Sequence, residues 1–303
     1  MPRTRLHADE VAIDDALARR LLAAQLPDVA DLPLTRLASG GTENAVFRLG
    51  DQLALRMPLQ PSAVDGLLKE VRWMPVVARH LSVETPTVVA LGDSSADYPF
   101  PWAVVRWLEG SDGLRTPLHR LPGAASDVTR LVGELQAVDT SGAPAPGSKG
   151  FGRGLPLVGR DADVRAGLDR CAARNLTDVD RLTTVWEEAL AAPPWQDAPV
   201  WLHADLIPGN VLVRDGRLAG LLDFGAMATG DPAYDITAAW HLLDAADRET
   251  FLTALDVDEA TRRRARGLVV GHAVVALPYY LDTHPAMVGT ARRGIEQVLS
   301  DPD

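Results

Sequence analysis

The sequence predicts an α+β fold in two parts, a strand-rich part over residues 1–108 and a mostly helical part over residues 109–303. Two observations predict it. Short apolar runs separated by glycine-containing turns dominate the first third of the chain, whereas segments with apolar residues three and four apart dominate after Glu109-Gly110. The 303 residues are 47% hydrophobic and 23% charged, which is ordinary for a folded protein of one large domain or two smaller parts.

The first part is expected to hold five strands and one main helix, preceded by an N-terminal helix over residues 8–26 that ends at Pro27. The strands are expected over residues 34–38, 45–49, 53–57, 86–92 and 102–108. Gly50-Asp51 joins the second strand to the third and predicts a hairpin. The main helix is expected over residues 63–74, where Pro75 should kink or restart it.

The second part is expected to hold helices over residues 124–139, 161–174 and 178–192, and again from about 232 to the end. A loose stretch rich in Gly, Pro and Ser covers residues 140–154. A compact β-rich piece is expected over residues 200–224. Within it, Asp215-Gly216 separates two strand-like runs and is a strong hairpin signal.

Composition excludes several classes of protein. The formal charge of −11 disfavours binding to nucleic acid, because the net field repels a polyanion. Cys171 is the single cysteine, so an intramolecular disulfide and a cysteine zinc cluster are excluded. No uninterrupted apolar run reaches 18 residues, and no apolar core follows the N-terminal arginines, so we expect neither a membrane span nor a signal peptide. Together these observations predict a cytoplasmic protein.

The chemistry is expected in residues 201–235, where Asp205, Asn210 and Asp223 stand in fixed order. The hairpin between Asn210 and Asp223 should bring its two ends together. An amide oxygen beside a carboxylate suits Mg²⁺ with bound phosphates, so both residues are candidate metal ligands. Asp205 would then lie nearby as the catalytic acceptor for a hydroxyl proton. This arrangement is what phosphoryl transfer requires.

The same segment resembles the catalytic loop and Asp-Phe-Gly element of the protein-kinase-like fold. The resemblance is carried by the series His203-x-Asp205-x4-Asn210, Asp223-Phe-Gly and Asp231-Pro-x-x-Asp235. It is specific in combination, although any single piece would be weak. In particular, the chain looks like a member of the aminoglycoside phosphotransferase family of small-molecule kinases, and the likeness extends over roughly residues 35–300. It implies a two-lobed fold with a five-stranded first lobe and a mostly helical second lobe.

The resemblance also implies roles for residues outside this segment. Each role competes with an ordinary structural one, such as a surface ion pair for Arg56 and Glu70 or a helix N-terminal carboxylate for Asp235. The implied nucleotide-binding residues are the phosphate loop Ser39, Gly40, Gly41 and Thr42, the pair Arg56 and Glu70, and Arg106 and Leu108 at the hinge. The residues implied to support the catalytic loop are His203 and Asp235.

One departure from the family pattern is Arg56, which stands where these kinases have Lys. A guanidinium can still contact phosphates, but its planar fork differs from an ammonium point charge. The chain has 28 Arg and only 2 Lys, so we expect a substitution that keeps function. Only seven residues separate Asp223 from Asp231 and no Ala-Pro-Glu follows, which argues against a protein kinase, since little backbone is left for a peptide platform.

The function expected is therefore transfer of a γ-phosphate from ATP or GTP, with Mg²⁺, to a hydroxyl of a small molecule. An aminoglycoside-like, cationic antibiotic is the leading acceptor by resemblance, which would make the protein an antibiotic-resistance enzyme. A sugar, choline-like, homoserine-like or macrolide acceptor stays open. A non-catalytic nucleotide-binding protein is the rival from another class. Four carboxylates could line an acidic acceptor pocket, although helix caps and solvated faces are the favoured alternative: Asp161, Asp163, Asp244 and Asp247.

Overall fold

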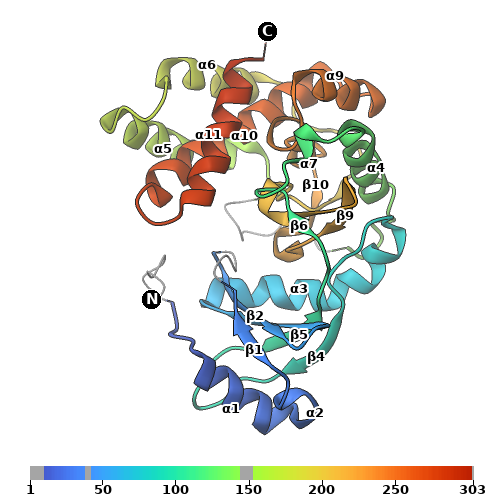
Figure 1. The fold of residues 1–303 in the computed structure, drawn as a ribbon. Helices are drawn as coiled ribbons and strands as arrows, with labels where there is room; N and C mark the ends of the chain where they lie inside the picture. The colour runs from blue at the N-terminus through green and yellow to red at the C-terminus, as the bar shows by residue number, and fades with distance from the viewer. Residues whose placement is uncertain (1–9, 38–41, 144–152, 302–303) are drawn as a thin grey trace. The chain divides into compact units, whose positions relative to one another are not determined.

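The computed structural model describes residues 10–37, 42–143 and 153–301 (Figure 1). The chain divides into two compact units. The first comprises Met1–Arg79, Glu84–Glu109 and Leu222–Gly225, and the second comprises His80–Val83, Gly110–Leu221 and Ala226–Asp303. A division between residues 108 and 109 was expected from the sequence, and it stays a prediction. The sequence did not predict that residues 222–225 belong to the first unit, because they lie more than 100 residues after the rest of it.

The first unit is built on the predicted five-stranded sheet, in which every neighbouring pair is antiparallel and the strand order is β1-β2-β3-β5-β4. Its strands are β1 (Leu34–Arg36), β2 (Asn44–Leu49), β3 (Leu53–Pro58), β4 (Val88–Gly92) and β5 (Trp102–Arg106). The expected hairpin joins β2 to β3, where Leu49 pairs with Leu53. Gly50 has φ +59° in that turn, a conformation that glycine adopts at little cost.

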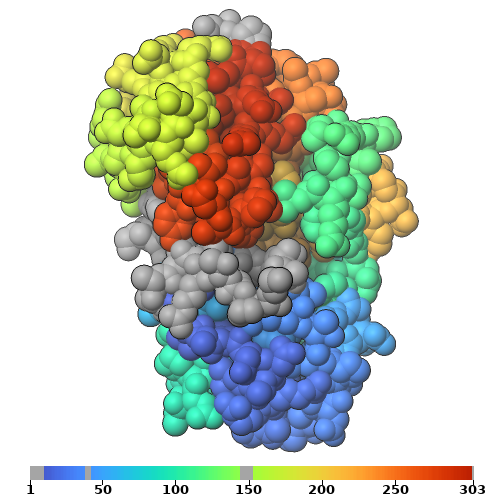
Figure 2. Space-filling model, turned by 60° about the vertical axis from the view of Figure 1, so that its left-hand side comes forward, coloured from blue at the N-terminus to red at the C-terminus, as the bar shows by residue number. Residues whose placement is uncertain are grey.

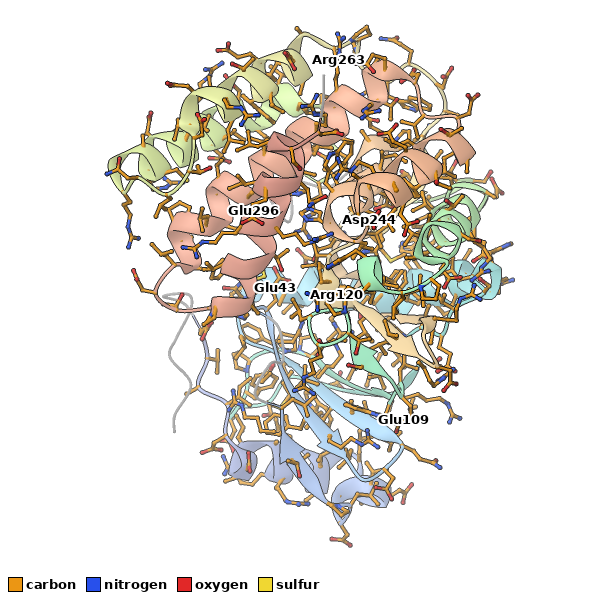
Figure 3. The ribbon with its side chains drawn as sticks, turned by 45° about the horizontal axis from the view of Figure 1, so that its top comes forward. Glu43, Glu109, Arg120, Asp244, Arg263 and Glu296 are labelled. Atoms are coloured by element: carbon orange, nitrogen blue, oxygen red, sulfur yellow. The ribbon has the colours of Figure 1, made fainter. Side chains whose placement is uncertain are left out.

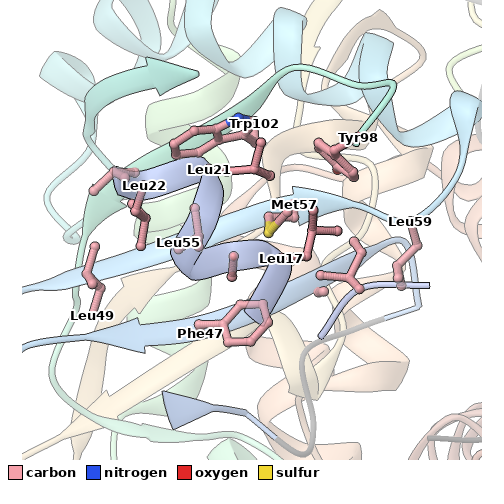
Figure 4. Packing of buried hydrophobic residues seen from close by; sticks show 14 residues of the cluster. Leu17, Leu21, Leu22, Phe47, Leu49, Leu55, Met57, Leu59, Tyr98 and Trp102 are labelled. Carbon is pink, nitrogen blue, oxygen red and sulfur yellow. The ribbon is translucent and has the colours of Figure 1, made fainter. Parts of the chain in front are cut away.

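The two faces of this sheet carry different helices, because side chains alternate along each strand. On one face, α1 (Asp15–Gln25) and α2 (Pro27–Ala30) cover a large apolar cluster that includes Leu21, Phe47 and Trp102 (Figure 4). On the other face, α3 (Pro61–Val77) packs Leu67 against a smaller cluster with Ala103. This second face positions α3, which carries one of the proposed site residues.

Two helices of this unit differ from the expectation. The first begins at Asp15 instead of residue 8, because Asp14 accepts a hydrogen bond from the Leu17 N–H at 2.7 Å and caps it there. The main helix runs through Pro75 to Val77 as one α-helix, so the predicted restart at Pro75 was wrong, and a kink there stays a prediction. Met74 and Val77 are both buried, and their packing holds the last turn despite the N–H that proline lacks.

The second unit is mostly helical, as predicted. Its helices are α4 (Ala124–Gln136), α5 (Asp161–Ala173), α6 (Val179–Ala191), α7 (Ala233–Ile236), α8 (Ala238–His241), α9 (Ala245–Ala254), α10 (Glu259–Tyr280) and α11 (Pro285–Leu299). The buried helix α10 packs against α5, α6 and α11. Figure 2 shows α5 and α6, in yellow-green, beside the red C-terminal helices on one face.

Short strands and 3₁₀ turns connect these helices. A two-stranded sheet pairs β7 (Val200–Leu202) with β10 (Ala228–Gly230), and a three-stranded sheet has the order β6 (Ser111–Asp112), β8 (Val211–Arg214) and β9 (Arg217–Leu221). The 3₁₀ helices are η1 (Ala78–His80), η2 (Leu118–Arg120), η3 (Leu157–Arg160), η4 (Pro208–Asn210) and η5 (Phe224–Ala226). The sequence did not predict β10, whose three residues are too few to show a period.

The predicted hairpin at Asp215-Gly216 joins β8 to β9. Arg214 pairs with Arg217, and the two turn residues have φ +53° and +72°. Positive φ at both positions is what a two-residue hairpin turn of the right twist requires. At the other end of the ladder Val211 pairs with Leu221.

Among the described residues, none of the helices is both long and apolar enough to cross a membrane. The longest, α10, has 22 residues and contains four arginines in its first half.

Candidate active site

The candidate catalytic aspartate, Asp205, lies in the loop between β7 and η4, and both of its carboxylate oxygens are engaged. Arg153 Nη2 donates to Asp205 Oδ1 at 2.9 Å. Asn210 Nδ2 donates to Asp205 Oδ2 at 2.9 Å and also to the Asp205 backbone oxygen at 2.9 Å. The second unit therefore brings two of the sequence-predicted residues together, and it adds an arginine that the sequence did not indicate.

A buried carboxylate holds the backbone of this loop. Asp235 is fully buried and accepts hydrogen bonds from the N–H groups of His203 at 2.8 Å and Ala204 at 2.7 Å. Ala204 has φ +61°, a strained conformation for a residue with a Cβ, and these bonds hold it immediately before Asp205. His203 is itself buried, and its Nδ1 accepts from the Asp205 N–H at 3.2 Å.

The electrostatics of Asp235 follow from this burial. Burial raises the pKa of Asp235 to about 7, the two backbone hydrogen bonds act against that rise, and the charge of Asp205 adds to it. Only the ionised carboxylate can accept both N–H bonds without offering a proton to one of them. The catalytic loop is therefore held best when Asp235 is charged.

The helix that carries Asp235 is anchored by the first aspartate of the Asp-Pro-x-x-Asp run. Asp231, two residues before Ala233, accepts from the Ala233 N–H at 2.9 Å where α7 begins. Its carboxylate also pairs with Arg264 of α10, at 2.7 Å to Nε and 3.2 Å to Nη2. Such a two-point arginine–carboxylate contact fixes orientation as well as distance.

In the first unit, Arg56 of β3 and Glu70 of α3 form the predicted ion pair. Arg56 Nη1 lies 2.5 Å from Glu70 Oε2, and Nη2 lies 3.3 Å from Oε1. The two side chains are only 11% and 4% exposed. Burial lowers the pKa of Arg56 while the carboxylates of Glu70 and Asp223 raise it, and the net direction is upward, so the guanidinium stays charged.

The Asp223-Phe224-Gly225 segment joins this pair within the same unit. Asp223 Oδ1 lies 3.9 Å from Arg56 Nη2, and Glu70 accepts a backbone hydrogen bond from Phe224. Asp223 has φ +57°, and its side chain is 44% exposed. Gly66 of α3 permits the close approach of this segment, because a Cβ there would lie 3.2 Å from the Gly225 Cα. The Asp223 carboxylate is therefore accessible to a ligand while it lies beside the Arg56 guanidinium.

The donor chemistry fits a magnesium ion bound together with phosphates. Asp223 offers an exposed carboxylate, and Asn210, whose Nδ2 is used by Asp205, offers Oδ1. In the part of the chain that the structure describes, no group of three or more His, Cys, Asp or Glu side chains could hold a metal ion. Either oxygen by itself leaves most of the coordination shell of Mg²⁺ to water and phosphate oxygens, as in nucleotide sites.

The remaining predicted nucleotide residues are less informative. Ser39, Gly40 and Gly41 lie outside the described residues. Thr42 is half-buried in the turn before β2, Arg106 is exposed at the end of β5 opposite Leu53, and Leu108 is half-buried just after β5. Their roles stay predictions.

The four carboxylates considered for an acidic pocket act as helix-start residues. Asp161 accepts from the Trp186 indole N–H and from Arg165 of its own helix. Asp244, labelled in Figure 3, caps α9 by accepting from the Asp247 N–H at 2.9 Å. Asp163 lies exposed in the first turn of α5. These contacts match the alternative that the sequence favoured.

Sequence reasoning missed Arg153, which pairs with Asp205 across 52 residues. It lies in a stretch that reads only as a loop, next to Gly154, and no motif marks it. Reading the sequence could not have found Arg160 either, which ends η3 and is buried.

The chain is similar to known phosphotransferases. Residues 34–268 match the model of the phosphotransferase enzyme family. Among curated proteins, a homoserine kinase from Acidiphilium cryptum is 30% identical over 243 residues, which are 75% of this chain and 70% of that protein. A homoserine kinase from Granulibacter bethesdensis is 43% identical over 61 residues, which are 20% of this chain and only 17% of that relative's length.

Solved structures show the same fold at lower identity. A GDP complex of aminoglycoside 2'-phosphotransferase-IIIa has a TM-score of 0.74 and 19% identity, with 95% of this chain and 99% of that chain covered. A macrolide 2'-phosphotransferase from Brachybacterium faecium has a TM-score of 0.62 and 24% identity, with 96% and 99% covered. The chain therefore belongs to the phosphotransferase enzyme family and has the kinase-like fold of the aminoglycoside and macrolide phosphotransferases.

Proposed function

We propose that this protein transfers the γ-phosphoryl group of ATP or GTP to a hydroxyl group of a small molecule. The observation that carries the proposal is the environment of Asp205. Its carboxylate is oriented by Asn210, and the strained backbone before it is held by the buried Asp235. A turn aspartate with no role in catalysis would not require this support, and strain of this kind is concentrated at functional sites.

In the proposed reaction the acceptor oxygen attacks the γ-phosphorus in line with the bond to the leaving nucleoside diphosphate. The new oxygen–phosphorus bond forms as the bond from the γ-phosphorus to the β–γ bridging oxygen breaks. Asp205 orients the hydroxyl and receives its proton. A normal carboxylate suffices, because a loose transition state needs proton removal only late.

The nucleotide phosphates are assigned to the first unit. Arg56 would contact them with its guanidinium, oriented by the two-point contact to Glu70. Asp223 and the Asn210 Oδ1 would hold Mg²⁺, which when bound neutralises charge on the phosphates. Ser39, Gly40, Gly41 and Thr42 are proposed to cover the phosphates, and Arg106 and Leu108 to lie beside the base.

The relatives support two kinds of acceptor. The solved structures include complexes with kanamycin and gentamicin, which favours the aminoglycoside expected from the sequence, but at 18–20% identity they show the fold alone. The curated relatives are homoserine kinases, and one of them aligns with three quarters of this chain. A small hydroxylated amino acid is therefore the second candidate.

A nucleoside diphosphate release assay tests the proposal directly. Purified protein is mixed with Mg²⁺ and ATP or GTP, and kanamycin, a macrolide, homoserine, choline and simple sugars are offered in turn. Asp205→Asn should lower kcat by about 100- to 10,000-fold, which is the range for removing a general base. Asp215→Asn, in the exposed hairpin turn, is the matched control and should leave kcat unchanged.

Two results would reject the proposal. Tight nucleotide binding with no turnover on any acceptor would favour a non-catalytic nucleotide-binding protein. Labelling of mixed peptides in preference to small molecules would favour a protein kinase.

A further inference from the structure

Arg153, which contacts the candidate base, interacts electrostatically with two further nitrogen-bearing side chains, of which Arg160 is buried, and we call Arg153, Arg160 and His272 the cationic cluster. Arg153 contacts Asp205 directly. Arg160, at the end of η3, and His272, on α10, interact electrostatically with Arg153 and with each other. Each of the three has a buried nitrogen with no hydrogen-bond partner among the described residues: Arg153 Nε, Arg160 Nη1 and His272 Nε2.

Buried donors without partners are costly. Arg160 is only 4% exposed, so water does not readily replace a missing partner. A buried donor of a charged group that is left unpaired loses its hydration without compensation. Such atoms need an explanation, and a ligand that reaches both Arg153 and Arg160 would supply partners for two of them beside the candidate base.

The neighbouring acidic groups do not neutralise the cluster. Asp205 is already shared between Arg153 and Asn210. Asp231 pairs with Arg264, and Asp163 lies exposed on α5. The Tyr234 hydroxyl oxygen accepts a hydrogen bond from Arg160, and the same hydroxyl donates to the Leu155 backbone oxygen at 2.8 Å.

The directions of the pKa shifts agree with an excess of positive charge here. Burial lowers the pKa of Arg160, and the charge of Arg153 lowers it further, although nearby Tyr234 and Asp163 act against this. Burial likewise holds the pKa of His272 well below its usual range, and both arginines add to that effect. His272 is therefore neutral, and the cluster carries the charge of its two arginines.

We propose that Arg153 and Arg160 bind an anionic group of the acceptor, in the first instance a carboxylate, next to Asp205. The inference rests on the kinase reaction proposed above and names the chemical class of its acceptor: a small molecule that carries both a hydroxyl and a carboxylate. A carboxylate matches the planar donors of arginine and supplies the partners that Arg153 Nε and Arg160 Nη1 lack.

The same geometry gives Arg153 a second role in the reaction. Without an acceptor, the Arg153 guanidinium donates to Asp205 Oδ1, whereas Asn210 donates to the other carboxylate oxygen, Oδ2. When an acceptor carboxylate draws the guanidinium away, this oxygen becomes available to the acceptor hydroxyl. Arg153 thus couples acceptor binding to exposure of the base and limits transfer of the phosphoryl group to water.

This class of acceptor differs from the aminoglycosides. A polycation placed against these two arginines, of which Arg160 is buried, would meet like-charge repulsion that water screens poorly. Aminoglycoside recognition requires carboxylates near the acceptor, and the carboxylates of Asp161 and Asp244 are used at helix starts. We therefore expect this chain to prefer a carboxylate-bearing acceptor to an aminoglycoside.

Matched acceptor pairs provide the first test, and they need no variant. L-Homoserine, 4-hydroxybutyrate and D-glycerate are each compared with their carboxamides, which differ only in the charge at the carboxyl group, and kanamycin serves as the polycation. Calorimetric titration into the protein with Mg²⁺ and a non-hydrolysable nucleotide measures binding. At least one carboxylate should bind at least about tenfold more tightly than its amide, and kanamycin should bind more weakly than that carboxylate.

Variants of the cluster provide the second test. Arg153→Met should raise acceptor-independent nucleotide hydrolysis severalfold while it lowers kcat/KM for the carboxylate acceptor about tenfold or more. If Arg153 had only a structural role, the variant would lower both the acceptor-independent hydrolysis and kcat/KM. Arg160→Lys should weaken carboxylate binding about tenfold. It is preferred to Arg160→Gln because it keeps the buried positive charge and is therefore more certain to fold. Arg165→Gln, on the exposed face of α5, is the matched control and should change neither quantity.

The outcomes separate the inference from the function beneath it. If nucleotide hydrolysis depends on Asp205 but the amides bind as well as the acids, or kanamycin binds more tightly than all of them, the anionic acceptor is wrong and the kinase proposal stands. If no carboxylate binds, the inference is likewise overturned. If hydrolysis does not depend on Asp205, the proposed function itself fails.

Discussion

The two units each contain an arginine–carboxylate pair at the proposed site, and the pairs are built differently. Arg56 and Glu70 make two contacts, with side chains 11% and 4% exposed. Arg153 and Asp205 make one contact at 2.9 Å, with side chains 21% and 18% exposed. A two-point buried pair holds one geometry, whereas a one-point pair with accessible edges can exchange partners. We infer that the first pair is a fixed scaffold for phosphates and the second a contact that yields to substrate.

The largest effect is expected from breaking the fixed pair. Glu70→Gln leaves the Arg56 guanidinium buried without its carboxylate, and it should lower the free energy of unfolding by about 3–5 kcal/mol. Urea denaturation measures this. Glu109→Gln, which removes an exposed partner of Arg48, is the matched control and should cost at most about 1 kcal/mol. Equal losses in the two variants would show that the Arg56–Glu70 pair is not the scaffold we describe.

Asp235 extends the comparison to a buried carboxylate that has no arginine partner in the described part of the chain, and it predicts a pH dependence. Its pKa of about 7 in the folded state is above the unfolded value of 3.8. The folded state therefore binds the extra proton, and the stability associated with it is present below pH 4 and is lost as the pH rises to about 7. The loss is at most about 4 kcal/mol.

Asp235→Asn removes this titration, so its stability should vary less than that of the wild type between pH 4 and 7 in denaturant titrations. Its kcat should fall at every pH, since an amide oxygen cannot accept both loop N–H bonds as well as a carboxylate does. Parallel stability curves for the two proteins would contradict the assignment of this slope to Asp235.

The smallest effect is expected where the charge of the fixed pair is kept. Arg56→Lys retains a cation beside Glu70 but loses the planar fork, so kcat/KM for the nucleotide should fall less than tenfold. Arg56→Met, which removes the charge, should lose at least about 100-fold. Steady-state kinetics at saturating acceptor distinguish them. If Lys performs as poorly as Met, the fork geometry matters more than the charge, and Arg56 is a specialised feature of this chain.

Local chemistry explains which features could be predicted from the sequence. The turns at Gly50-Asp51 and Asp215-Gly216 define the two hairpins, because such residues tolerate positive φ where others do not. Short apolar runs between glycine-containing turns identified the strands of the first unit. The ordered series from His203 to Asp235 pointed to the catalytic loop, and the pairing of Arg56 with Glu70 followed from the same family pattern.

Other features depended on contacts between distant segments. The start of α1 is set by the capping residue Asp14 and not by the periodicity of its apolar residues. The helix α3 continues beyond Pro75 because Met74 and Val77 are buried. Arg153 reaches Asp205 across 52 residues from a stretch without periodicity or motif. Sequence patterns record neighbours along the chain, whereas the partner of a buried charge is chosen by which segments pack together. The kind of chemistry was therefore predictable from the order of residues, whereas the arginine that contacts Asp205 became apparent only in the folded structure.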